Sequence, residues 1–177
     1  VWKAIKALRE SGCDITAATN RGYALLSSGD VLSAEAVRRY IPALPLDITC
    51  VSTISSTNSA LKERAASGAP EGTVLIASEQ TLGRGRYGRK FYSPGGTGLY
   101  LSIILRPRLE AEKAQLMTCL AAVAAAEAVE AVSGQPVSIK WVNDLLLRER
   151  KICGILTEAS LDLESGGLDW AVLGIGF

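Results

Sequence analysis

The sequence contains no histidine and only four cysteines, which stand far apart at Cys13, Cys50, Cys119 and Cys153. Zinc sites built on histidine or on closely spaced cysteine pairs are therefore excluded, and no carboxylate cluster indicates another metal cage. Nucleophile systems that need an imidazole base, such as Ser-His-Asp or Cys-His, are excluded as well. Any chemistry must rely on positioning and on electrostatic stabilisation.

The chain also carries almost no net charge and no long uninterrupted apolar run. A balance of +1 over 177 residues gives no global attraction to nucleic acid, so any basic function must be local. The most apolar stretch, residues 114–132, is mostly alanine and includes Glu127 and Glu130, which predicts a buried helix rather than a membrane span. No signal peptide is visible. These features favour a folded cytoplasmic protein with one main core.

Against this background, the stretch Gly83 to Lys90 is exceptional. It reads Gly-Arg-Gly-Arg-Tyr-Gly-Arg-Lys, with four cations and three glycines in eight residues. A solvated basic surface loop accounts for the charges alone. The alternation favours an anion-binding loop, because glycines let backbone N–H groups approach an anion while guanidinium groups close around it.

Two familiar phosphate-binding patterns lie close to this loop, and both fail on context. The glycines fit G-x-G-x-x-G, but Pro94 and its neighbouring glycines prevent the helix that a dinucleotide fingerprint requires. The spacing also fits a P-loop, yet Arg89 and Lys90 replace the Lys-Ser/Thr pair that would hold magnesium. Rossmann and Walker sites are therefore disfavoured.

The first 45 residues form a separate region. Residues 1–12 show helical periodicity, and residues 13–18 and 23–26 flank a glycine turn at 19–22. A helix followed by a basic-tipped hairpin is typical of the latter half of a winged helix, and the abrupt start indicates a chain cut inside an element. Lys3, Lys6 and Arg21 are candidate DNA-binding residues, although a solvated helix face is the simpler account of the lysines.

From residue 46 onward, strand patterns alternate with helices. We expect helices ending at Ala66 and spanning 114–132, and strands at 48–54, 73–78, 98–105, 137–141, 145–147, 151–158 and 170–175. Ser56 and Thr57 are N-cap candidates, at a place where backbone N–H groups could also point at a ligand. Strands joined in hairpins with helices between them predict an α+β fold with a mixed, largely antiparallel sheet.

Several short motifs occur in the order found in biotin protein ligases, and together they cover nearly the whole chain. They are Ser56-Thr57-Asn58, Gln80, the loop Gly83 to Arg89, Leu99-Tyr100-Leu101-Ser102, Lys140-Trp141-Val142-Asn143-Asp144, Lys151 to Leu156, and Gly174-Ile175-Gly176. The chain resembles the bifunctional members of that family, which also repress transcription. The resemblance implies a class II synthetase-like catalytic domain at 46–177, incomplete at its C-terminus, after a winged-helix remnant and linker at 1–45.

The resemblance also implies roles for individual residues. Those implied to bind biotin are Ser56, Thr57, Asn58, Gln80, Gly83, Arg84, Gly85, Arg86, Lys151, Gly154, Leu156 and Gly174. Those implied to bind the nucleotide are Arg86, Arg89, Phe91, Lys140, Asn143 and Lys151. Catalysis would rest on Arg86, Lys151 and Asp144, with the arginine-glycine loop closing over biotin and the adenylate.

The sequence departs from the family pattern at two of these positions. Phe91 stands where family members often have a tryptophan that stacks on adenine. Val142 stands where proline is usual, which leaves the polar residues of that motif intact. Asn143 and Asp144 are also the residues of an ordinary Asx turn, so their local role stays open.

The implied activity is ATP-dependent biotinylation of a lysine on a biotin carboxyl carrier protein, with biotin and ATP as substrates and Mg²⁺ arriving with ATP. The carboxylate of biotin is already ionised at neutral pH, so its attack on the α-phosphate needs cations rather than a histidine base. A biotin-responsive repressor, binding operator DNA only as the complete protein, is compatible with this activity. A lipoate-ligase relative is the alternative, and a homodimer stays open.

Overall fold

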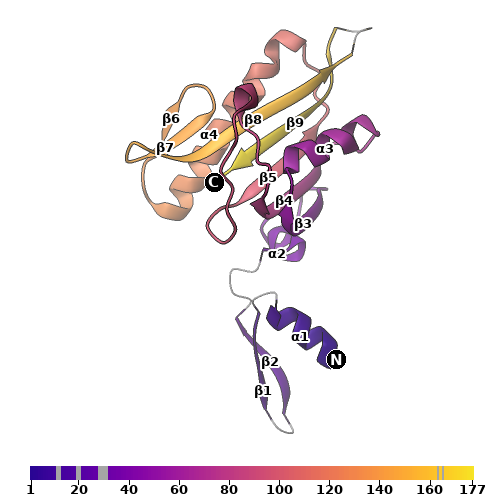
Figure 1. The fold of residues 1–177 in the computed structure, drawn as a ribbon, viewed down its shortest axis with the longest axis vertical. Coiled ribbons are helices and arrows are strands. Elements are labelled where there is room, and N and C mark those ends of the chain that lie inside the picture. The colour runs from indigo at the N-terminus through magenta and orange to yellow at the C-terminus, as the bar shows by residue number, and fades with distance from the viewer. Residues whose placement is uncertain (11–12, 19–20, 28–31, 163, 165) are drawn as a thin grey trace. The chain divides into compact units, whose positions relative to one another are not determined.

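The computed structural model describes residues 1–10, 13–18, 21–27, 32–162, 164 and 166–177 (Figure 1). The predicted turn residues Thr19 and Asn20 lie outside the described residues. The described chain forms two compact units, Val1–Leu44 and Pro45–Phe177.

The first unit consists of two short helices and a hairpin. Helix α1 spans Trp2–Glu10, the antiparallel strands β1 and β2 span Asp14–Ala18 and Gly22–Ser27, and helix α2 spans Ala34–Tyr40. Arg9 donates to the carbonyl oxygen of Ile15 from Nε at 3.0 Å and from Nη2 at 2.6 Å, so this cation joins α1 to β1. Lys3, Lys6 and Arg21 are exposed.

The second unit is built on a seven-stranded sheet in the order β3-β4-β5-β9-β8-β7-β6. Its strands are β3 (Asp47–Ile54), β4 (Thr73–Gln80), β5 (Tyr100–Leu105), β6 (Ser138–Lys140), β7 (Asp144–Leu147), β8 (Arg150–Leu161) and β9 (Leu168–Gly176). Strands β3 and β4 are parallel, and every other neighbouring pair is antiparallel. The predicted α+β fold with a mixed, largely antiparallel sheet is confirmed.

Two helices cover opposite faces of this sheet. Helix α3 (Thr57–Ala66) packs through the fully buried Leu61 in a cluster that includes Val172 of β9. Helix α4 (Ala114–Ser133) packs through its alanines in a cluster that includes Leu173. Because successive side chains of a strand point to opposite faces, the adjacent residues 172 and 173 place the two helices on different sides.

Helix α4 is buried on one side only, which corrects the expectation of a buried helix. Its alanines Ala121, Ala122, Ala125 and Ala126 lie in the core, whereas Leu116, Leu120 and Val123 are exposed. With the 3₁₀ turn η2 (Ala111–Lys113) it is long and apolar enough to cross a membrane by length and composition. Small residues on the packed side let the helix approach the sheet closely, as in the core of a folded domain.

The segment 81–99 joins β4 to β5 and contains the arginine-glycine loop with the 3₁₀ turn η1 (Arg86–Gly88). An isolated bridge between Arg84 and Lys90 closes the loop at its base. In Figure 1 this segment passes in front of β8 and β9, on the α3 side of the sheet. The prediction that the loop runs between two strands is confirmed.

We expect Leu61→Ala to lower the free energy of unfolding by about 2–5 kcal/mol, because it opens a cavity where Leu61 is 0% exposed. Urea unfolding followed by circular dichroism measures the change. Leu161→Ala is the control, since that leucine is 53% exposed and its loss should cost about 0.5 kcal/mol or less. Equal losses in the two variants would contradict the assigned core.

Candidate active site

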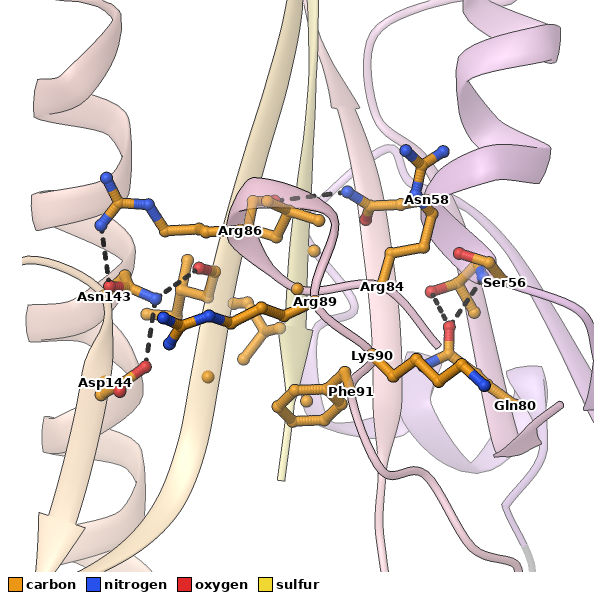
Figure 2. A pocket seen from close by; sticks show the side chains of 18 of the residues that line it. Ser56, Asn58, Gln80, Arg84, Arg86, Arg89, Lys90, Phe91, Asn143 and Asp144 are labelled. Atoms are coloured by element: carbon orange, nitrogen blue, oxygen red, sulfur yellow. Dashed lines mark hydrogen bonds between the residues drawn. The ribbon is translucent and has the colours of Figure 1, made fainter. Parts of the chain in front are cut away.

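A cavity of about 270 Å³ lies between the N-terminus of α3, the strands β8 and β9, and the arginine-glycine loop. Figure 2 shows Ser56, Asn58 and Gln80 on one side of it and Asn143 and Asp144 on the other. The lining residues are Ser56, Thr57, Asn58, Gln80, Arg84, Gly85, Arg86, Tyr87, Arg89, Lys90, Phe91, Leu101, Asn143, Asp144, Lys151, Gly154, Ile155, Leu156, Gly174, Ile175 and Gly176.

Two rows of paired residues cross β5, β9 and β8 beneath the cavity, and their members on β8 and β9 line it. Each row has a glycine of β9 at its centre. The register gives the rows as Tyr100, Gly176 and Gly154, and as Ser102, Gly174 and Leu156. Residues two apart on a strand share a face, so both rows point to the α3 side.

Phe91 lies on the first row because that row has no side chains on β8 and β9. A Cβ atom at Gly154 would come within 2.7 Å of the Phe91 ring, and one at Gly176 within 2.5 Å. The Lys151 ammonium lies 5.6 Å from the centroid of the same ring, and Tyr100 meets the ring edge to face at 6.4 Å. Glycine at these two positions is what allows the aromatic ring to cover this row.

The α3 end of the cavity is a set of neutral hydrogen-bonding groups. Ser56 caps α3 by accepting from the N–H of Ser59 at 3.3 Å. The Oε1 atom of Gln80 accepts from the Thr57 N–H at 2.9 Å and lies 3.1 Å from the Thr57 hydroxyl. Gln80 donates in turn to Ser93 Oγ at 3.1 Å. These bonds hold the first turn of α3 against β4 and the loop.

The carboxylate of Glu158 lies next to this end, outside the lining of the cavity. Glu158 accepts from Lys62 at 2.6 Å and from Asn58 Nδ2 at 3.1 Å. Burial by itself raises the pKa of the Glu158 carboxyl, but the bonds from Lys62 and Asn58 and the charges of Lys62 and Arg84 outweigh it, so the pKa is lowered. Glu158 is therefore ionised at neutral pH.

The other end of the cavity is cationic and is organised by Asn143. Arg86 donates from Nη1 to Asn143 Oδ1 at 3.1 Å, and Asn143 Nδ2 donates to Asp144 Oδ1 at 3.0 Å. The same Asp144 oxygen lies 2.8 Å from the Lys151 ammonium. One asparagine thus links the loop arginine to the Lys151–Asp144 ion pair.

Cys153 is not a nucleophile in this site. Burial raises the pKa of its thiol to about 12; the charge of Asp144 adds to the effect, while Lys151 and a hydrogen bond with the Gly176 backbone oppose it. The thiol is therefore neutral at physiological pH.

Most of the residues that the sequence predicts to bind biotin or the nucleotide line this one cavity. Two of them do not. Gly83 packs against Phe91 and Ser93 at the base of the loop, and Lys140 is exposed on β6. Val142 is buried, and the Trp141–Val142 peptide bond is cis.

Three polar residues that support the cavity were not singled out as site residues from the sequence. Ser102 was seen only as part of a strand motif, and it lies under Thr57 and Asn58. Glu158 is on the same face of β8 as Gly154 and Leu156, so a carboxylate at that spacing was the available signal. The sequence offers one signal for Lys62, which is its position one helical turn after Asn58.

Comparisons with known proteins give one consistent result. Residues 50–177 match the Biotin/lipoate A/B protein ligase family. The chain is 38% identical over 178 residues to the Bifunctional ligase/repressor BirA of Bacillus spizizenii, a match that covers 99% of this chain and 54% of the relative. The chain thus spans about half the length of such relatives.

Solved structures agree with these relatives. The biotin protein ligase from Aquifex aeolicus in complex with biotin and ATP has a TM-score of 0.62 and 37% identity, covering 74% of this chain and 51% of that one. The biotin protein ligase from Leishmania major in complex with biotinyl-5-AMP has a TM-score of 0.61 and 28% identity, covering 76% and 57%.

The lowered pKa of Glu158 predicts a pH-dependent contribution to stability. Its ionised form favours the folded state above the unfolded pKa of about 4.3, and this contribution disappears as the pH falls through the lower folded pKa. Urea unfolding should therefore show the wild type more stable than Glu158→Gln at pH 7, with the difference shrinking below about pH 4. A difference that is constant from pH 7 to pH 3 would contradict this assignment.

Proposed function

The chain belongs to the biotin/lipoate A/B protein ligase family, and on that premise we propose that the protein is an ATP-dependent biotin protein ligase. It converts biotin to biotinyl-5′-AMP and transfers the biotinyl group to a lysine of a biotin carboxyl carrier protein. The observation that carries the proposal is the two-ended cavity, with the hydrogen-bonding groups of Thr57 and Gln80 at α3 and the guanidinium of Arg86 at the Asn143 end.

In the first step, a carboxylate oxygen of biotin attacks the α-phosphorus of ATP. The bond from that phosphorus to the bridging oxygen breaks, pyrophosphate leaves with Mg²⁺, and no proton is transferred. The protein therefore needs cations that offset repulsion and stabilise charge on the phosphoryl oxygens. Arg84, Arg86, Arg89 and Lys151 line the cavity and supply them, and Phe91 offers an aromatic face for adenine.

In the second step, the neutral amine of the acceptor lysine attacks the acyl carbon of biotinyl-AMP, AMP leaves, and the amine gives up a proton. Asp144 already uses Oδ1 for Lys151 and Asn143, so Oδ2 is the oxygen that would receive the acceptor amine.

Biotin is favoured over lipoate as the acid by the chemistry of the α3 end. Thr57, Gln80 and Asn58 place polar atoms around that end, hydrogen-bonded to one another and to Glu158. A ureido ring provides two N–H donors and a carbonyl acceptor for further hydrogen bonds with these groups. The dithiolane ring of lipoate provides neither, so it would displace water from them without replacing its hydrogen bonds.

The decisive experiment gives the complete protein biotin, Mg-ATP and an isolated carrier domain, and follows biotin on the carrier by mass spectrometry. We expect incorporation that needs both ATP and the acceptor lysine. Lipoate in place of biotin should give little or no product. Incorporation of lipoate but not biotin would overturn the assignment.

A second function, DNA binding by a biotin-responsive repressor, is suggested by the first unit and by the bifunctional name of the Bacillus relative. Exposed Lys3, Lys6 and Arg21 on a helix and hairpin are its candidate phosphate contacts. We place the protein in the cytoplasm, where ATP, carrier proteins and free thiols coexist. Operator binding and homodimerisation belong to the complete protein.

Arg86→Ala should release biotinyl-AMP faster, by about tenfold to a hundredfold, because it removes a charge-assisted contact at the adenylate end. Stopped-flow release from the preformed complex measures this rate. Arg148→Ala is a matched control at an exposed arginine that bonds Gln135 outside the cavity. Equal release from wild type and Arg86→Ala would show that the loop does not hold the adenylate.

A further inference from the structure

The neutral end of the cavity rests on a continuous hydrogen-bond chain that ends in an ion pair. The chain runs from Gln80 to Thr57, from Thr57 to Ser102 at 2.8 Å, from Ser102 to Asn58 at 2.6 Å, and from Asn58 to Glu158 at 3.1 Å. Ser102 is 0% exposed, and Thr57 and Asn58 are 3% and 4% exposed. The groups are therefore shielded from water, and each proton must be placed within the chain.

The carboxylate of Glu158 determines which way the Asn58 amide faces. With Nδ2 toward Glu158, Asn58 donates to the carboxylate and to the carbonyl of Leu156 at 3.4 Å. The reversed amide would put Oδ1 against a charged acceptor, which leaves two buried acceptors without a proton between them. Lys62, at 2.6 Å, keeps Glu158 charged and in place.

The direction of Asn58 then determines the Thr57 hydroxyl. Ser102 has one proton for two contacts, and Asn58 Oδ1 cannot donate, so the Ser102 proton goes to Asn58. The Thr57 hydroxyl donates to Gln80 Oε1 at 3.1 Å, beside the Thr57 N–H at 2.9 Å, and its oxygen faces the Ser102 hydroxyl at 2.8 Å. Because Asn58 Oδ1, at the shorter distance, holds the Ser102 proton, the Thr57 oxygen remains an acceptor for an N–H donor in the cavity. A reversed Asn58 amide would instead send the Ser102 proton to Thr57.

The position of the Asn58 side chain is fixed by close packing on β9, so only the direction of its amide is left for Glu158 to determine. A Cβ atom at Gly174 would overlap the amide of Asn58, so the side chain lies directly on the β9 backbone. In Figure 2 Asn58 lies beside Arg84, at the side of the cavity opposite Asn143. The Asn58 amide thus packs against Gly174 of β9 and is hydrogen-bonded to the charged Glu158 carboxylate.

We propose that the Lys62–Glu158 ion pair is a positioning element for ligand recognition: through Asn58 and Ser102 it makes the Thr57 hydroxyl an acceptor for an N–H group of the bound ring. The proposal rests on the proposed function, since the ureido ring of biotin is the N–H donor concerned. Neither Lys62 nor Glu158 lines the cavity, so both act through other residues.

Isothermal titration calorimetry of the complete protein with biotin, together with steady-state kinetics, tests the proposal. Glu158→Gln keeps the shape of the side chain but permits both orientations of the Asn58 amide. We therefore expect Kd and KM for biotin to rise about tenfold, which corresponds to the loss of about one hydrogen bond. KM for ATP and kcat should stay as in the wild type. Lys62→Met should change biotin affinity in the same direction, and Lys62→Arg should retain wild-type affinity.

Glu79→Gln is the matched control, because Glu79 also accepts from a threonine hydroxyl, that of Thr53 at 3.1 Å, but lies outside the chain and the cavity. If Glu158→Gln does not fold, Lys62→Met supplies the same test at a side chain that is 33% exposed. Either folded variant binding biotin as tightly as the wild type overturns the proposal, and so does a matching loss in kcat and in KM for ATP. A wild type that binds no biotin instead overturns the proposed function, and the inference with it.

Discussion

The cavity exists because three positions on two neighbouring strands have no side chain. Gly154 and Gly176 leave the space that the Phe91 ring occupies, and Gly174 leaves the space for the Asn58 amide. Because the register pairs Gly154 with Gly176 and Leu156 with Gly174, these gaps form adjacent rows on one face of the sheet. Any Cβ atom there would displace a group that forms a wall of the cavity. The backbone of β8 and β9 is thus the surface on which Phe91 and Asn58, two groups that line the cavity, lie.

The two ends of the cavity repeat the same polar arrangement. At each end an asparagine donates from Nδ2 to a carboxylate, and that carboxylate is paired with a lysine, as Asn58–Glu158–Lys62 and as Asn143–Asp144–Lys151. The two ends differ in the donor to the asparagine Oδ1 atom. Asn58 accepts from the neutral hydroxyl of Ser102, and Asn143 accepts from the guanidinium of Arg86. At each end, a carboxylate therefore orients an asparagine amide, and that amide orients a hydroxyl or guanidinium group.

Local patterns predicted the elements and much of the lining, because both depend on neighbours in sequence. The Ser56 cap, the end of α3 at Ala66 and the strand pairs follow from capping, periodicity and turn residues. Local patterns do not indicate the Lys62–Glu158 ion pair, because it connects a helix with a strand and its two residues are 96 positions apart in the sequence. Lys140 was placed at the nucleotide by its motif, yet β6 leaves it exposed outside the cavity. The one-sided burial of α4 likewise depends on which face meets the sheet.

In a chain without histidine, two ion pairs hold the charged groups around the cavity in place. Glu158 stays ionised because Lys62 and its hydrogen bonds outweigh burial, and Asp144 is held against Lys151. The one buried thiol beside this pair, Cys153, stays neutral because burial raises its pKa to about 12. The cavity therefore offers a ligand fixed positions and fixed charges, held by hydrogen bonds and ion pairs, in place of an imidazole.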